Sequence, residues 1–330
     1  MSIADRTTIA EIAKLAGVSV PTVSKVINGK PGVSNAKRLT ITQLLHEHEY
    51  EPRRSAPTGV IAVVFGELSS PWSLALVSAL ERVAFDNDMG MLLTVMRPGT
   101  GEWVDMLGGK NVDGVIFAAV EVAPSDQERF RQLELPTVLV DPRTLPDSGT
   151  VTVGVTHWRG ARAATDHLVD LGHQRIAMIS GPRHLLFSQA RVDGYRAALR
   201  SADIVVPEDY IVATEYGFAA GREAALDLLK RTPRPTAIFA ASDEQALGIY
   251  EAARLSGLRI PADVSVVGFN DVPIAEWASP PLTTVREPIF DTAREAIRLL
   301  RVEMAEAGEA VAVELVTDLI IRESTAAPTL

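Results

Sequence analysis

The first residues of the chain carry a short helical pattern that ends at a glycine. Apolar side chains recur at helical spacing over 9–16, and the residues of this stripe are Ile9, Ile12, Ala13 and Ala16. Thr8 and Glu11 have the spacing of a capping box, which predicts that the helix begins directly after Thr8. Gly17 predicts its end, because glycine accepts the positive φ of a tight turn.

A second helical pattern follows Ser19, a residue type that favours helix starts. Pro21 falls in its first turn, where a missing N–H costs nothing. The predicted buried face of this helix consists of Val23, Val26 and Ile27. A third helix is predicted over 36–49, with an apolar side formed by Leu39, Ile41, Leu44 and Leu45. Two short helices joined by a glycine turn favour a helix-turn-helix, which places its second helix in the DNA major groove. A plain helical cap on a larger domain is the alternative.

Beyond residue 59, apolar runs typical of buried strands alternate with helical patterns. Strands are predicted over 60–65, 91–96, 114–119, 137–140, 151–155, 175–180, 210–213, 237–240, 265–269, 311–316 and 319–322. Helices are predicted over 71–85, 104–108, 125–133, 159–171, 191–202, 219–230, 244–255 and 291–306. This alternation predicts an α/β body with two doubly wound parallel sheets.

Charge separates the two parts of the chain. The whole chain carries −10, whereas residues 1–58 carry +3 and the remainder carries −13. A basic head on an acidic body restricts phosphate contact to the head. The run 53–58 between them has no periodicity and is predicted to be a linker.

Composition narrows the class of protein. The chain has 330 residues and no Cys, which excludes disulfides, thiol nucleophiles and zinc fingers. The carboxylates and histidines form no metal-ligand spacing, and the sequence has no phosphate loop, dinucleotide fingerprint or nucleophile elbow. No enzyme, metal or cofactor is therefore predicted. The start of the chain lacks a signal segment and no apolar run would span a bilayer, so we expect a cytoplasmic protein without membrane contact.

The whole N-terminal block resembles the LacI/GalR family of bacterial repressors. The resemblance continues in family order along the chain, through Leu171-Gly172-His173, Arg191 with Gly194-Tyr195, Ser242-Asp243 with Ala246-Leu247-Gly248, 264–271 (VSVVGFND) and 280–285 (PPLTTV). It implies two hinged lobes of the periplasmic-binding-protein type behind the head, with the chain crossing back near 280–285. The implied division is 1–52 for the helix-turn-helix domain, 53–58 for a truncated hinge linker, 59–171 with 285–315 for the first lobe, and 172–284 with 316–330 for the second.

The resemblance also implies function. It predicts a transcriptional repressor that binds a palindromic operator as a homodimer and is released by a mono- or disaccharide bound between the lobes. A regulator that responds to a non-sugar such as a nucleobase, as a co-repressor, is the alternative, and a sugar-modifying enzyme with an adventitious helical head is a third.

Base-reading positions of the family fall here on Val20, Pro21 and Lys25, of which Lys25 could donate to guanine. Phosphate contacts or helix caps are predicted for Thr8, Ser19, Thr22, Ser24 and Asn28, and a solvated helix face is the alternative for Thr22 and Ser24. Arg53 and Arg54 are predicted to enter the minor groove by charge, because the linker is short and holds no Leu that could wedge between base pairs.

Effector candidates follow the predicted strands, where open α/β sheets bind ligands. They combine hydrogen-bonding and aromatic groups suited to a sugar, and they are Ser69, Ser70, Trp72, His157, Trp158, Phe187, Arg191, Phe218, Asp243, Phe269 and Asn270. Arg191 matches the sugar-contacting arginine of the family, and Asn270 stands where many relatives have Asp. Asp243 could equally orient its own loop. Many relatives carry Asp-Asn where this chain has Thr156-His157, so the usual contact there does not transfer directly.

Overall fold

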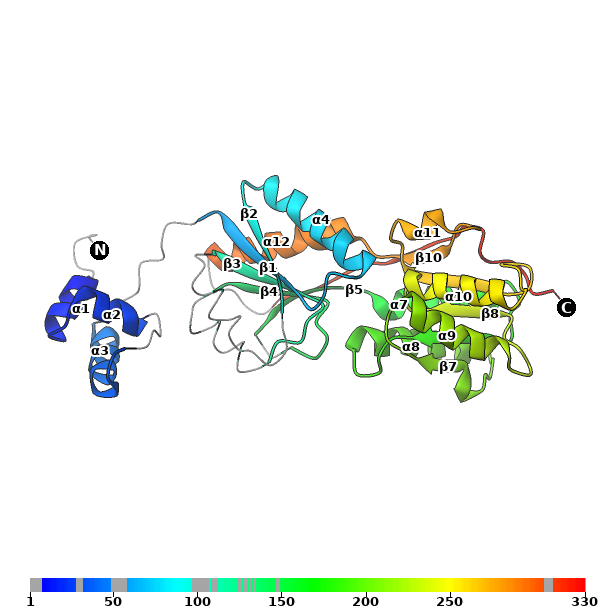
Figure 1. Ribbon diagram of the computed structural model, residues 1–330, viewed down its shortest axis with the longest axis horizontal. Coiled ribbons are helices and arrows are strands. Elements are labelled where there is room, and N and C mark those ends of the chain that lie inside the picture. The colour runs from blue at the N-terminus through cyan, green and yellow to red at the C-terminus, as the bar shows by residue number, and fades with distance from the viewer. Residues whose placement is uncertain are drawn as a thin grey trace. The chain divides into compact units, whose positions relative to one another are not determined.

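The computed structural model describes residues 8–27, 32–48, 58–96, 107, 112–123, 126, 130, 132, 135–146, 149–305 and 311–329. The chain divides into two compact units, a head over Met1–Thr58 and a body over Gly59–Leu330. Figure 1 shows the helices of the head and the sheets and helices of the body.

The head consists of α1 (Ile9–Leu15), α2 (Val20–Ile27) and α3 (Asn35–Glu47). Its small core confirms most of the predicted apolar positions, and the buried members are Ile12, Ala13, Val23, Val26 and Ile41. The side chain of Ile27, also predicted to be buried, lies outside the described part of the structure. Thr8 caps α1 in a reciprocal capping box with Glu11. Hydrogen bonds from Thr8 to the Glu11 carboxylate lower the pKa of Glu11. Gly17 adopts a φ of +63°, as the predicted turn requires.

One predicted core residue of the head is wrong. Leu39 is 73% exposed, whereas Ile41 on the same helix is buried. Residues two apart on a helix point about 200° away from each other, so both could not face one core. Leu44 and Leu45 pack partly buried against the core, as predicted.

The body contains two six-stranded sheets, which define its two lobes. The first sheet has the order β11-β5-β4-β3-β1-β2 and is parallel throughout. Its strands are β1 (Val60–Phe65), β2 (Gly90–Val95), β3 (Gly114–Ala118), β4 (Thr137–Val140), β5 (Val151–Val155) and β11 (Ala312–Leu315). Helices α4 (Pro71–Phe85) and α12 (Ile289–Ala305) cover one face of this sheet, although about 200 residues separate them (Figure 1).

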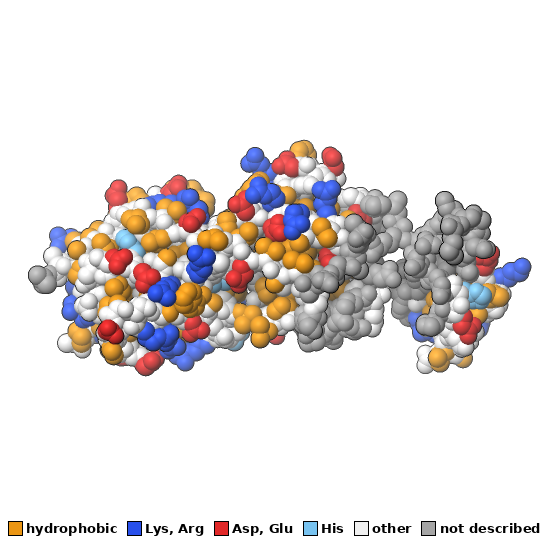
Figure 2. Space-filling model, turned by 180° about the vertical axis from the view of Figure 1, so that it is seen from behind, with side chains coloured by type: hydrophobic (Ala, Val, Ile, Leu, Met, Phe, Trp, Pro, Cys, Tyr) orange, Lys and Arg blue, Asp and Glu red, His pale blue; other side chains and the backbone are white. Residues whose placement is uncertain are grey.

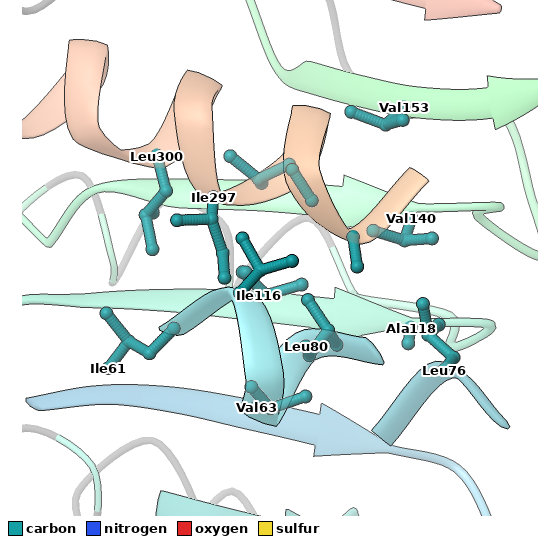
Figure 3. Close-up of a cluster of buried hydrophobic side chains, with 14 of the residues drawn as sticks. Ile61, Val63, Leu76, Leu80, Ile116, Ala118, Val140, Val153, Ile297 and Leu300 are labelled. Carbon is teal, nitrogen blue, oxygen red and sulfur yellow. The ribbon is translucent and has the colours of Figure 1, made fainter. Parts of the chain in front are cut away.

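Alternate residues of the strands serve opposite faces of this sheet, which explains their continuous apolar runs. Ile61 and Val63 of β1 face α4 and α12, where they meet Leu80 and Ile297 (Figure 3). The intervening Ala62 and Val64 pack on the other face, in a second cluster that includes Phe117 and Phe130.

The second sheet has the order β12-β10-β9-β8-β6-β7. Its strands are β6 (Ile176–Ser180), β7 (Ile211–Ala213), β8 (Ala237–Ala240), β9 (Ser265–Asn270), β10 (Thr283–Arg286) and β12 (Asp318–Ile320). All neighbours are parallel except β10 and β12, which pair antiparallel. Helices α7 (His157–Asp170) and α8 (Leu186–Ser201) cover one face, and α9 (Phe218–Leu229) and α10 (Asp243–Leu255) cover the other. A short α11 (Ile274–Trp277) precedes β10, and a 3-10 turn η1 (Glu208–Tyr210) precedes β7.

The first lobe boundary lies elsewhere than predicted. Helix α7 packs on the second sheet, since Ala161, Ala164 and Leu168 belong to the core with Met178 and Phe239. The chain therefore leaves the first lobe after β5, near residue 156, rather than at 171. It returns near residue 287, between β10 and α12, and crosses a third time near 317.

Other features of the second lobe were not predicted. Strand β10 lies where only a crossing of the chain was expected, and α8 begins at Leu186 rather than at 191. No side chain caps the start of α8, so the sequence carries no local signal for it. The predicted helices 104–108 and 125–133 lie almost wholly outside the described residues.

Charges of both signs occur together on the surface of the body. Acidic and basic side chains are interspersed over the face of the body that Figure 2 shows. Within the described parts of the chain, no helix combines the length and the apolar character needed to cross a membrane.

Candidate functional site

A cavity of about 750 Å³, which includes its part open to solvent, lies at the carboxyl ends of strands from both sheets. The first lobe contributes the ends of β1, β3 and β4 and the start of α4, with Phe65, Ser70, Trp72, Asp141 and Arg143. The second lobe contributes the starts of α7 and α8 and the end of β9, with His157, Phe187, Arg191 and Asn270. A small molecule in this cavity would therefore touch both lobes.

Arg191 is the central cation of the cavity and is 4% exposed. Its guanidinium carbon lies 3.8 Å from the centre of the Phe269 ring, which stacks behind it. One terminal nitrogen donates to the carbonyl of Ala241, and the other, Nη2, lies 2.8 Å from the Glu287 carboxylate. The remaining nitrogen, Nε, is buried without a hydrogen-bond partner among the described residues. A buried donor without a partner is costly, and a ligand oxygen that reached this N–H would remove that cost.

Glu287 lies where the chain returns from the second lobe to the first, and its carboxylate contacts both lobes. Its Oε1 accepts from Arg191 and, at 2.9 Å, from the amide of Asn270. Its Oε2 accepts at 2.7 Å from the indole N–H of Trp72, on α4 of the first lobe. Burial raises the pKa of Glu287, and the charge of Arg191 opposes that shift. One buried carboxylate thus joins the first lobe, the second lobe and the chain between them.

A second link across the cavity joins His157 to Asp141. His157 Nε2 lies 3.0 Å from Asp141 Oδ1, and His157 Nδ1 lies 3.2 Å from Arg191 Nη2. A guanidinium can only donate, so Nδ1 of His157 accepts the hydrogen bond from Arg191. Nε2 of His157 therefore carries the ring proton and donates a hydrogen bond to the Asp141 carboxylate. The hydrogen-bonded cluster therefore runs from Asp141 of the first lobe through His157 and Arg191 to Glu287.

The motif around Arg191 has a packing explanation. A β-carbon at Gly194 would overlap the carbonyl oxygen of Trp158, so glycine allows α8 to lie close against α7. Tyr195 is fully buried and donates at 2.8 Å to the carbonyl of Ile176 on β6. Burial raises the pKa of Tyr195 above its usual range. These two residues fix α8 so that Arg191, one turn earlier, faces the cavity.

Six of the predicted effector residues line the cavity, namely Ser70, Trp72, His157, Phe187, Arg191 and Asn270. The other five do not. Ser69 is exposed and donates to Glu67, while Trp158 and Phe218 are 39% and 45% exposed on their helices. Phe269 is buried behind Arg191 and supports it.

Asp243 does not line the cavity and has hydrogen-bond partners of its own. It is fully buried behind the cavity, where Thr284 donates to its Oδ1 at 2.5 Å and the backbone N–H of Val272 donates to its Oδ2 at 2.9 Å. Burial raises its pKa to about 8. Asp243 therefore holds β10 and the 271–273 turn together, which is the alternative role that the sequence left open for it.

The two acids that organise the cavity were missed from sequence. Glu287 follows β10, and without that strand no carboxyl end was expected there. Asp141 follows the correctly predicted strand β4 directly, so the rule that identified Ser70 and Asn270 would also have found Asp141.

The predicted DNA-reading residues of α2 are accessible. Val20 is 40% exposed, and Pro21 and Lys25 are exposed beside it. Ser19 and Thr22 share a hydrogen bond of 2.9 Å between their hydroxyls, and Ser24 is half-buried. The hydroxyl of Thr8 serves the cap of α1. Asn28, Arg53 and Arg54 lie outside the described residues.

Comparison with known proteins identifies both units. Residues 8–53 match the family of bacterial regulatory proteins called the lacI family, and residues 165–325 match the periplasmic binding protein-like domain. The regulator DegA of Bacillus subtilis is 34% identical over 97% of this chain and 98% of its own. The ribose operon repressor of Escherichia coli is 32% identical over 89% of this chain and 92% of its own.

Solved structures agree with the sequence matches. The complex of the regulator CelR with cellobiose superposes with a TM-score of 0.76 at 33% identity, covering 97% of this chain and all of that one. The lac repressor dimer bound to operator and an anti-inducer superposes with a TM-score of 0.71 at 26% identity, covering 97% and 99%. The family consists of DNA-binding regulators rather than enzymes, in agreement with the sequence. The chain belongs to the lacI family of bacterial transcriptional regulators.

Proposed function

We propose that the protein is a cytoplasmic repressor that binds a palindromic operator as a homodimer and releases it when a mono- or disaccharide enters the cavity. The observation that carries the effector half is the buried Arg191, stacked on Phe269 with its Nε left without a partner among the described residues. Such a group matches a sugar hydroxyl oxygen. Among its relatives, CelR is seen with cellobiose, and the lac repressor is seen as a dimer on its operator.

Ligand binding can change lobe closure through the contacts that already cross the cavity. The bond from Trp72 to Glu287 and the bond between His157 and Asp141 each join the two lobes. A ligand that replaces or strengthens these bonds favours one closure over another, which shifts the population between two states of the body. In this proposal one state binds the operator and the other releases it.

The effector half is tested by thermal unfolding of the full chain against a panel of neutral mono- and disaccharides and nucleobases. A ligand at about 100 times its dissociation constant adds about 2.7 kcal/mol to the stability of the folded state. We expect a sugar to stabilise the protein and to release operator DNA recovered by in vitro selection. Arg191→Ala should lose both responses and keep operator affinity, while Arg200→Ala, exposed on the same helix, should keep both. Equal sugar affinity in Arg191→Ala would remove Arg191 from the site.

A nucleobase effector that acts as a co-repressor is the second candidate. The rings of Phe187 and Tyr216 lie 6.0 Å apart, and both residues line the cavity, where they could stack on a planar base. Stabilisation by a base that tightens operator binding would support this candidate over the sugar.

The DNA half is tested at Lys25. Because Lys25 is exposed on the second helix of the helix-turn-helix, Lys25→Ala should relax preference at one operator position by about 1–3 kcal/mol. Lys37→Ala removes the same charge from α3 and should weaken binding to all operator variants alike. If Lys25→Ala also weakened binding to all operator variants alike, Lys25 would contact a phosphate rather than a base. The minor-groove contact of Arg53 and Arg54 in the short linker remains a prediction.

A further inference from the structure

The buried polar atoms of the cavity that lack a partner are donors. Among the described residues, three buried side-chain nitrogen or oxygen atoms have no hydrogen-bond partner, and two of them, Nε of Arg143 and Nε of Arg191, belong to residues that line this cavity. None of the three is a carboxylate oxygen. The buried acids of the lining are already engaged, because Glu287 accepts from three donors and Asp141 accepts from His157. A ligand that brings acceptor oxygens would therefore satisfy what the cavity leaves unsatisfied.

Arg143 is held at the cavity by contacts to both lobes. It lies three residues after β4, and its backbone N–H donates at 3.2 Å to the carbonyl of Val120, in the loop after β3. Its carbonyl accepts at 3.1 Å from the backbone N–H of Leu186, the first residue of α8 in the second lobe. A β-carbon at Gly66 would lie 3.8 Å from Nη1 of Arg143, so the guanidinium extends to the end of β1. The half-buried side chain therefore lies along the strand ends that form the cavity.

The two guanidinium groups of the cavity differ in their counterions. Nη2 of Arg191 lies 2.8 Å from the Glu287 carboxylate, whereas Arg143 forms no ion pair with any residue that the structure describes. A partly buried cation without a counterion is costly, and a neutral hydroxyl would satisfy its N–H groups without balancing its charge. An anionic oxygen would do both, and such charge-assisted hydrogen bonds are about twice as strong as neutral ones.

We propose that the effector is an acidic sugar, whose carboxylate is bound by Arg143 and whose hydroxyl oxygens accept from Arg191. This rests on the proposed function of the cavity as the effector site. The planar guanidinium of Arg143 matches the two oxygens of a carboxylate. A phosphate carries about 1.5 to 2 negative charges at neutral pH, which is more than one unpaired guanidinium balances in a cavity also lined by acids. Arg143 and Arg191 belong to opposite lobes, so one ligand bound by both also links the lobes.

The test is calorimetry on the full chain near neutral pH with matched ligands. Three series, built on glucose, galactose and mannose, each contain the hexose, its uronate, the neutral uronamide and the hexose 6-phosphate. In at least one series we expect the uronate to bind roughly tenfold or more tightly than the hexose and the uronamide, because only the uronate supplies the missing counterion. The 6-phosphate should bind more weakly than the uronate, and the same uronate should release operator DNA.

Variants of Arg143 then separate its charge from its shape. Arg143→Gln should remove most of the preference for the uronate, because glutamine donates hydrogen bonds without a charge. Arg143→Lys keeps the charge but not the planar fork, so it should retain a smaller preference. Arg294→Gln is the control, because it removes one positive charge from the same lobe at a side chain that is 64% exposed on α12, away from the cavity. This control should keep the full preference.

Other outcomes overturn the proposal. A hexose that binds as tightly as its uronate would overturn it and leave the proposed function intact. A 6-phosphate that binds more tightly than the uronate would assign Arg143 to a phosphate. An unchanged preference for the uronate in Arg143→Gln would place the carboxylate elsewhere in the cavity. Absence of binding by every sugar, neutral or acidic, would refute the sugar effector as well.

Discussion

Two buried acids at or beside the cavity, Glu287 and Asp243, differ in what surrounds them. Glu287 faces the cavity and is held by three charged or polar side chains, those of Arg191, Asn270 and Trp72. Asp243 faces away from it and is held by a hydroxyl and a backbone N–H, without a cation. A position at the carboxyl end of a strand is therefore not enough for a role in binding. The partner of the acid decides whether it serves the cavity or the fold.

The largest expected effect is the loss of stability when Arg191 loses its counterion, Glu287. Glu287→Ala would leave the guanidinium of Arg191 buried without a counterion, which typically costs about 3–5 kcal/mol of unfolding free energy. Urea denaturation at neutral pH measures this. Glu287→Gln keeps an oxygen acceptor and should lose less. If Glu287→Ala were as stable as the parent, the ion pair with Arg191 would not stabilise the body.

Asp243 should instead make stability depend on pH. Its pKa of about 8 in the folded protein lies above the value near 3.8 of an unperturbed Asp, so the folded state binds a proton that the unfolded state lacks. Stability should therefore fall as pH rises, by about 1 kcal/mol per pH unit between about pH 5 and 8. Asp243→Asn mimics the protonated acid, so it should lack this part of the decline. Parallel stability curves for the two proteins over that range would contradict the assignment.

Trp72→Phe tests the bond that joins Glu287 to the first lobe. The change retains an aromatic ring and removes the N–H that donates to Oε2 at 2.7 Å. An unpaired buried carboxylate oxygen should cost about 2 kcal/mol. Trp277→Phe is the matched control, since Trp277 is 76% exposed on α11 and its loss should cost no more than about 0.5 kcal/mol. Equal effects of the two changes would show that the ring matters and the N–H does not.

The smallest effect is expected at Thr284, the hydroxyl partner of Asp243. Thr284→Val preserves shape and removes one neutral hydrogen bond, which should cost about 1 kcal/mol. Because the hydroxyl lowers the pKa of Asp243, its loss should also extend the pH-dependent decline to higher pH. A decline that moved to lower pH would show that Thr284 favours the protonated acid.

Strands with a local apolar pattern could be predicted from the sequence, and strands placed by pairing could not. Apolar runs such as 60–65 and 237–240 are buried on both faces of a sheet, so their pattern is local and their bounds were predicted correctly. Strand β10, with the polar run Thr283-Thr284, gains its place from pairing with β9 and β12, which no local pattern records. Glu287 was missed for that reason.

Side-chain direction was the other source of error. Trp158, Phe218 and Asp243 all lie within two residues of a helix start at the correct edge of a sheet. The first two nevertheless point toward solvent and the third points behind the cavity. Residue type and position along the chain do not fix the direction of a side chain. Arg191 was placed in the cavity because it matches a family motif, not because of its position after a strand.

The order in which the chain is synthesised gives the three crossings a further consequence. The first lobe contains the earliest strands of the body, yet its core also needs Ile297 and Leu300 of α12, and its sheet ends with β11. A ribosome must therefore make the whole second lobe up to β10 before the first can close over its apolar face. Until then the faces of β1, β3 and β4 remain open to chaperones and to other nascent chains. The lobe that is synthesised first is completed nearly last.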